Sequence, residues 1–163
     1  MKKIICAGVV CALAMAMEAP AHATTFSVLG GISSGNGSGY GASNPSPLVG
    51  GEITFGLADI FQLGAFYDYN FLSYGGGGMG SVQFMGGIAR LGLGSSGFFL
   101  DGEVGPTITT GSSAELGIGG GVGYRFNIVP MVDISPRFGI RDVPNGSATQ
   151  NLLDFGILLS FGF

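Results

Sequence analysis

Charged residues are scarce in this chain. Only 10% of its 163 residues are Asp, Glu, Lys or Arg, whereas 46% are hydrophobic, and the formal net charge is −4. An intrinsically disordered chain needs the opposite balance, so this class is excluded. So few cations cannot form the basic patch that nucleic-acid binding requires, and we expect no nucleic-acid partner.

Long apolar runs are also missing. Beyond the N-terminal segment no stretch reaches the 18 or so apolar residues of a membrane-spanning helix. The mean hydropathy is nevertheless +0.50, and the 33 glycines are about a fifth of the chain, against roughly 7% in ordinary proteins. A membrane-like composition without a spanning helix favours a transmembrane β-barrel.

The N-terminal segment has the features of a secretory signal. Lys2 and Lys3 precede an apolar stretch, residues 4–17, that is too short to span a bilayer, and an A-x-A cleavage site ends at Ala23. We therefore interpret residues 1–23 as a cleaved signal peptide and residues 24–163 as a single mature domain.

The mature domain lacks several reactive residue types. Residues 24–163 contain no cysteine, histidine or lysine; they have four arginines and nine acidic residues. A disulfide is therefore impossible, and no His or Cys cluster is available for zinc or iron. We expect neither a metal nor another cofactor.

Hydrophobic and polar residues alternate with a period of two, which indicates β-strands. In the last segment, for example, Phe155 and Ile157 share one face, while Asp154 and Gly156 share the other. The pattern predicts eight strands over residues 25–33, 48–57, 61–71, 81–93, 98–108, 114–126, 131–141 and 152–163. The connections 34–47, 72–80 and 142–149 are longer than the turns 58–60, 94–97 and 127–130, a difference that is typical of outer-membrane barrels.

The composition of the two faces predicts which one meets lipid. The polar face consists mostly of Gly, Ser and Thr, which suit the narrow interior of an eight-stranded barrel. A soluble, lipocalin-like barrel with the apolar face inside is the alternative, but it needs a well-charged exterior. The predicted fold class is therefore all-β, an eight-stranded antiparallel transmembrane β-barrel.

The signal, the eight alternating strands and the C-terminal pattern together resemble the small eight-stranded outer-membrane β-barrels of the OmpX and OmpA transmembrane-domain type. This resemblance implies the outer membrane of a Gram-negative bacterium, reached through the periplasm, and contact with outer-membrane lipid and lipopolysaccharide. The alternating C-terminal residues look like the signal recognised by the barrel assembly machinery: Phe155, Ile157, Leu159, Phe161 and Phe163.

Charged side chains on the polar face predict a polar lumen. We expect the following residues to point inward: Glu52, Gln62, Asp68, Gln83, Asp101, Glu103, Glu115, Arg125, Asp133, Arg137, Arg141 and Asp154. The central cluster is predicted to contain Glu52, Glu115, Arg125 and Arg137, either as a structural plug or, as the resemblance to OmpA implies, as an ion gate.

Arg90 does not fit this assignment, because it shares a face with Phe84 and Ile88. That face is expected to meet lipid, so Arg90 would either extend to the headgroups or be turned inward by a bulge at Gly86-Gly87.

These features predict a function without catalysis. The known enzymes of this architecture rely on histidine, which residues 24–163 lack, so we expect no enzyme. The favoured function is a structural anchor that displays its longer loops to an unknown surface ligand, for adhesion or interaction. The alternative is a narrow gated pore for ions or small solutes.

Overall fold

The computed structural model describes residues 24–37, 41–58, 60–74, 78–93, 96–145 and 148–163. The predicted signal peptide, residues 1–23, lies outside the described residues. No helix among them is long and apolar enough to cross a membrane. The regular elements are ten strands: β1 (Thr24–Gly37), β2 (Gly41–Asn44), β3 (Ser46–Ala58), β4 (Phe61–Tyr74), β5 (Met79–Gly92), β6 (Phe98–Thr109), β7 (Glu115–Tyr124), β8 (Phe126–Val129), β9 (Val132–Asn145) and β10 (Ala148–Gly162).

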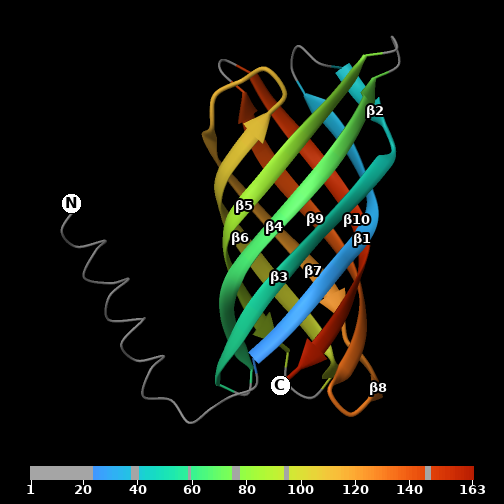
Figure 1. Ribbon diagram of the computed structural model, residues 1–163, viewed down its shortest axis with the longest axis vertical. Coiled ribbons are helices and arrows are strands. Elements are labelled where there is room, and N and C mark those ends of the chain that lie inside the picture. The colour runs from blue at the N-terminus through green and yellow to red at the C-terminus, as the bar shows by residue number, and fades with distance from the viewer. Residues whose placement is uncertain (1–23, 38–40, 59, 75–77, 94–95, 146–147) are drawn as a thin grey trace, which may run out of the picture.

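The ten strands form the eight walls of one closed antiparallel barrel (Figure 1). β2 and β3 make one wall, interrupted at Pro45, and β7 and β8 make another, interrupted at Arg125. The last strand, β10, pairs with both β9 and β1, which closes the sheet. Closure leaves no free strand edge, so a barrel can satisfy its backbone hydrogen bonds inside a membrane.

The strands are strongly tilted. Starting at Thr24 on β1, we follow each residue to its paired partner on the next strand until the path returns to β1. The path returns at Ser34, ten positions further along the strand. With a rise of about 3.3 Å per residue and a strand spacing of about 4.8 Å, this stagger gives a tilt of about 40°. The intermediate partners are Phe55, Leu63, Ala89, Gly102, Gly120, Ile140 and Leu153.

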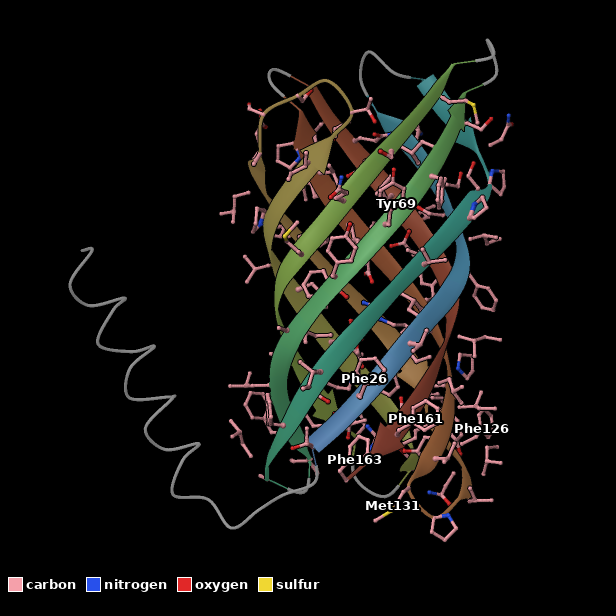
Figure 2. The ribbon with its side chains drawn as sticks, in the orientation of Figure 1. Phe26, Tyr69, Phe126, Met131, Phe161 and Phe163 are labelled. Carbon is pink, nitrogen blue, oxygen red and sulfur yellow. The ribbon has the colours of Figure 1, made fainter. Side chains whose placement is uncertain are left out.

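The predicted alternation is present along the walls. On β6, residues from Phe99 to Thr109 are buried at every second position, and Leu100 and Val104 between them are exposed. β10 shows the same pattern, with Phe155 and Ile157 outside and Asp154 inside. Figure 2 shows side chains projecting outward along both sides of the barrel in this view. The sheet has an apolar exterior, and the predicted eight-stranded antiparallel barrel is confirmed.

Aromatic side chains surround the barrel at the end where β1 begins and β10 ends. Phe26, Phe126 and Phe161 lie there in Figure 2. Rings on adjacent walls are in contact: Phe98 packs edge-on against Tyr124, with centroids 4.7 Å apart. This is the kind of belt found at a lipid–water interface. We call this the turn end of the barrel and the opposite one the loop end.

The longer connections are shorter than predicted. β1 continues to Gly37, β2 begins at Gly41, and β3 begins at Ser46, so most of the predicted loop 34–47 is strand. The same holds for the predicted loops 72–80 and 142–149, where β4, β5, β9 and β10 extend the ladder. The glycine, serine and proline content of these segments suggested loops. Hydrogen bonds to the adjacent strands nevertheless hold these residues in an extended conformation. The tips, residues 38–40, 75–77 and 146–147, lie outside the described residues.

Candidate functional site: the charged lumen

Arg90 crosses the lumen from β5 to β3. Its two Nη groups donate to the two Oε atoms of Glu52, at 2.6 and 2.9 Å. Nη2 of Arg90 also lies 3.6 Å from a carboxylate oxygen of Asp101 on β6. All three side chains are buried. The paired contact with Glu52 is bidentate, which gives an arginine–carboxylate bond both strength and a fixed orientation.

Arg137 on β9 joins two carboxylates of β6. Its Nε donates to Asp101 at 2.8 Å, and its Nη2 donates to the other oxygen of Asp101 at 2.6 Å. The same Nη2 donates to Glu103 at 2.6 Å. Asp101 and Glu103 point inward together because they are two positions apart on one strand.

Arg141 also lies on the inner face of β9. It contacts three carboxyl groups, more than either Arg90 or Arg137 does. Its Nε donates to Glu103 at 2.9 Å, its Nη2 donates to Asp68 on β4, and its Nη1 lies 3.0 Å from Asp154 on β10. These contacts make a single connected group, which we call the lumen network: Arg90, Arg137, Arg141, Glu52, Asp68, Asp101, Glu103 and Asp154. Its three guanidiniums face five carboxyl groups.

Glycines on β7 provide the space for the network. The inner face of this strand carries Gly117, Gly119, Gly121 and Gly123 in succession. A Cβ at Gly121 would come within 2.9 Å of both Arg137 and Asp101, and one at Gly119 within 2.9 Å of Arg141 and 3.0 Å of Glu103. The glycine-rich sequence of β7 is therefore a flat wall against which the long arginine side chains lie.

Apolar side chains close the lumen on the loop side of the network. Leu72, Val82, Val143 and Leu152 form one buried cluster near the loop-end limits of β4, β5, β9 and β10. Within the network the free space is about 10 Å³, bordered by Glu52, Asp68, Glu103 and Arg137. A single water molecule needs roughly that volume. The described side chains therefore fill most of the lumen at the level of the network.

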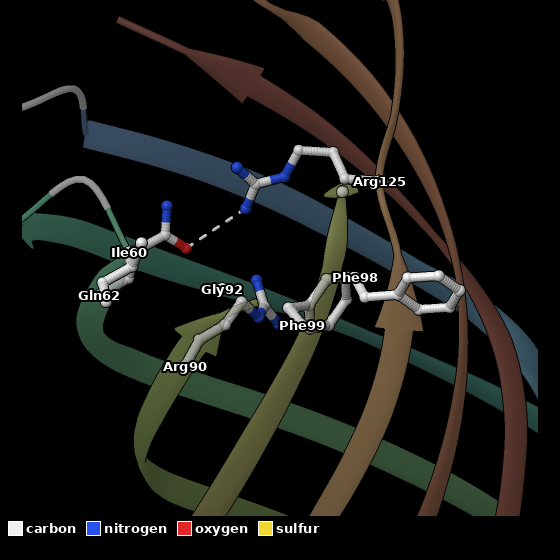
Figure 3. Close-up of a pocket in the computed structure, with 8 residues that line it drawn as sticks. Ile60, Gln62, Arg90, Gly92, Phe98, Phe99 and Arg125 are labelled. Carbon is white, nitrogen blue, oxygen red and sulfur yellow. Dashed lines mark hydrogen bonds between the residues drawn. The ribbon is translucent and has the colours of Figure 1, made fainter. Parts of the chain in front are cut away.

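The turn end of the lumen is more open. A cavity of about 80 Å³ lies between Arg90 and Phe99 on one side and Gln62 and Arg125 on the other (Figure 3). Arg125 donates to Oε1 of Gln62 over 3.5 Å. A recess of about 310 Å³ also borders Gln62 and Arg125 and extends to Phe163 and Asp133 at the end of the barrel.

Comparisons by sequence and by structure give different results. The chain matches no protein-family model, and none of the curated proteins matches it in sequence. Several solved structures do match. Neisserial surface protein A superposes with a TM-score of 0.72 at 10% identity, over 86% of this chain and 97% of that protein.

Two further barrels align over similar lengths. The attachment invasion locus protein Ail of Yersinia pestis gives a TM-score of 0.57 at 10% identity, with 86% of this chain and 99% of Ail covered. The outer membrane protein OprG of Pseudomonas aeruginosa gives 0.58 at 10% identity, with 89% and 98% covered. The chain has the fold of the small outer-membrane β-barrels.

In this outer-membrane barrel fold the four predicted cluster residues lie at different heights along the lumen. Glu52 and Arg137 belong to the lumen network, but they contact different partners. Glu115 is the first residue of β7, near the loop end, and Arg125 lies at the turn end beside Gln62 and Asp133. The sequence predicted that all four side chains lie on the inner face. It did not show how far along the barrel axis each residue lies, because the strands are tilted and staggered.

Arg90 and Gln83 correct the predicted face of β5. Arg90 points into the lumen together with Phe84 and Ile88, while Gln83 is on the outer face and accepts a hydrogen bond from Tyr67 at 3.2 Å. No bulge is involved, because β4 and β5 pair without a shift. The error arose because the inner face of β5 carries large apolar side chains, which looked like a lipid-facing stripe.

The C-terminal pattern lies where the alternation placed it. Phe155, Ile157, Leu159 and Phe161 share the outer face of β10, and Phe163 follows the strand with its side chain exposed. Their role as an assembly signal stays a prediction. Among the described residues no group of three or more potential metal ligands is arranged to hold an ion.

Proposed function

We propose that this protein is an outer-membrane barrel whose lumen is closed and whose function lies in anchoring its loop end at the cell surface, for adhesion or interaction. The apolar exterior and the fold support a place in the outer membrane of a Gram-negative bacterium, in contact with lipid and lipopolysaccharide. A secretory signal at residues 1–23 and recognition of β10 by the assembly machinery complete this proposal. The Yersinia neighbour Ail is described as the attachment invasion locus protein.

The densely filled lumen is the observation that carries this proposal. The lumen network spans β3, β4, β5, β6, β9 and β10, and the apolar cluster of Leu72, Val82, Val143 and Leu152 lies beyond it. A gated pore would require these buried ion pairs, two of them bidentate, to separate together. Asp101 and Glu103 are both held by arginines in these ion pairs, which supports a role without catalysis.

Conductance separates the closed anchor from the gated pore. We expect the purified protein to insert into a planar lipid bilayer without stepwise current, both as wild type and as Arg137→Ala. A porin added to the same bilayer is the positive control. Resolved current steps in the wild type that change in Arg137→Ala would establish the pore instead.

Surface display can be tested on intact cells. An epitope placed in the connection 110–113, at the loop end, should be labelled from outside, whereas one in the turn 129–131 should be labelled only after the membrane is opened. Cells that produce the protein should adhere to host or neighbouring cells better than cells that produce a variant with shortened loop-end connections. A folded barrel changes its gel mobility when the sample is heated, so this shift shows that both proteins are folded. If both are folded and cells with either one adhere equally well, the adhesion role is refuted.

A further inference from the structure

The turn-end cavity has donors on two sides and a small volume. Arg90 and Arg125 both border it, and Gln62 lies beside Arg125 (Figure 3). Its volume of about 80 Å³ corresponds to two or three water molecules at roughly 30 Å³ each. A group of four or five heavy atoms fits this space.

The donors of Arg125 are only loosely engaged. Its Nη2 is 3.5 Å from Oε1 of Gln62, at the limit of a hydrogen bond, and its Nε is 3.7 Å from Asp133, beyond that limit. The Arg125 side chain is 38% exposed, which places the guanidinium between the cavity and the recess. Arg125 is therefore free to bind a second acceptor from the turn side.

Arg90 lines the inner side of the cavity with a buried side chain. The residue is 3% exposed, and while its two Nη groups bind Glu52, its Nε has no hydrogen-bond partner among the described residues. The Arg90 guanidinium also lies 4.5 Å from the centre of the Phe99 ring, which fixes its position. Arg90 therefore contributes a fixed, buried guanidinium to the inner wall of the cavity.

We propose that the turn-end cavity is a binding site for a small oxyanion, either a carboxylate or a phosphate group. The oxyanion would lie between the guanidiniums of Arg125 and Arg90 and accept hydrogen bonds from Arg125 and Gln62. Asp133 opposes binding, because it competes for Arg125 and adds negative charge at the mouth. Arginine forks favour planar or tetrahedral oxyanions over chloride, because several donors point at separate oxygens. This site is independent of the role proposed for the loop end.

The test is a titration of the full protein in nanodiscs of zwitterionic lipid, followed by two-dimensional NMR. Inorganic phosphate and acetate are added separately, with sodium chloride holding the ionic strength constant. We expect saturable shifts of the Arg125 Nε–H, the Gln62 side-chain amide and the Gly92 backbone amide. Binding of both anions assigns a general oxyanion site, whereas binding of one alone assigns its class.

Three variants decide whether the cavity is responsible. Arg125→Gln keeps a polar side chain but removes the charge, and it should weaken binding at least about tenfold, the usual scale for loss of a charge-assisted hydrogen bond. Asp133→Asn should strengthen binding. Asp142→Asn makes the same change in net charge at an exposed position near the loop end, and it should leave the affinity unchanged.

Several results would overturn the proposal. They are an absence of saturable shifts at 50 mM anion, about equal binding by wild type and Arg125→Gln, or an equal gain in Asp133→Asn and Asp142→Asn. The last of these would mean that the anion responds only to overall charge. Each variant is accepted only if it keeps the heat-dependent gel mobility of a folded barrel.

Discussion

Replacing Arg141 by alanine is expected to lower the free energy of unfolding by about 3–5 kcal/mol, the usual cost of removing one partner from a buried ion pair. The Arg141 side chain is completely buried, and it is bound to Asp68, Glu103 and Asp154. Alanine would leave these buried carboxyl groups without their shared cation. They would have to take up protons or draw water into the barrel.

The measurement is unfolding by urea in lipid vesicles. Because the chain contains no tryptophan, the folded fraction is best followed by the gel mobility of unheated samples. Arg125→Ala is the matched control, since that side chain is 38% exposed and makes one ion pair at 3.7 Å. The control should cost at most about 1 kcal/mol, as for other partly exposed pairs. Equal losses in the two variants would show that the lumen network does not stabilise the barrel.

Asp154→Asn tests the charge balance of the same network. Five carboxyl groups face three guanidiniums in this network. Nη1 of Arg141 lies 3.0 Å from Asp154, but neither carboxylate oxygen of Asp154 accepts a hydrogen bond with acceptable angles among the described residues. Asn removes one surplus negative charge and keeps the shape of the side chain. The loss of stability should therefore be much smaller than for Arg141→Ala.

The sequence was informative about the walls because alternation is a local property. Each strand carries its own period of two, so the eight walls and the inward direction of Asp101, Glu103 and Arg137 could be predicted without knowing their neighbours. The heights of residues could not be predicted, because the stagger between tilted strands depends on pairing around the whole barrel. That stagger separates Glu115 and Arg125 and brings Arg141 to Asp68 and Glu103.

The face of β5 shows a second limit. Phe84 and Ile88 are buried in the lumen, where Phe66 packs edge-on against Phe84 with ring centroids 4.8 Å apart. An eight-stranded barrel must fill its interior with side chains, and apolar groups fill it as well as polar ones do. Hydrophobicity alone therefore does not identify the lipid side of a strand. The neighbouring strands settle it, because Arg90 on the same face binds Glu52.

Two glycines of β6 should respond in opposite ways to the same substitution. Gly105 faces the lumen, and a Cβ there would lie well inside 3.0 Å of the backbone of Met85 and Gly86 on β5. Gly102 is on the outer face of β6, and a Cβ there would meet nothing within 4 Å. The two positions share a strand and a residue type, so they differ mainly in the space available.

Gly105→Ala is expected to destabilise the barrel by about 3 kcal/mol, the upper end of the usual cost of overpacking, because backbone atoms and not a movable side chain must shift. Gly102→Ala should be neutral or should stabilise the barrel by up to about 1 kcal/mol, since alanine restricts the unfolded chain. Urea unfolding in vesicles measures both. If Gly105→Ala were tolerated as well as Gly102→Ala, β5 and β6 could not lie as close at Gly86 and Gly105 as they do here. The inward glycines would then be dispensable, and the narrow lumen that holds the arginines would have to be explained by side-chain volume alone.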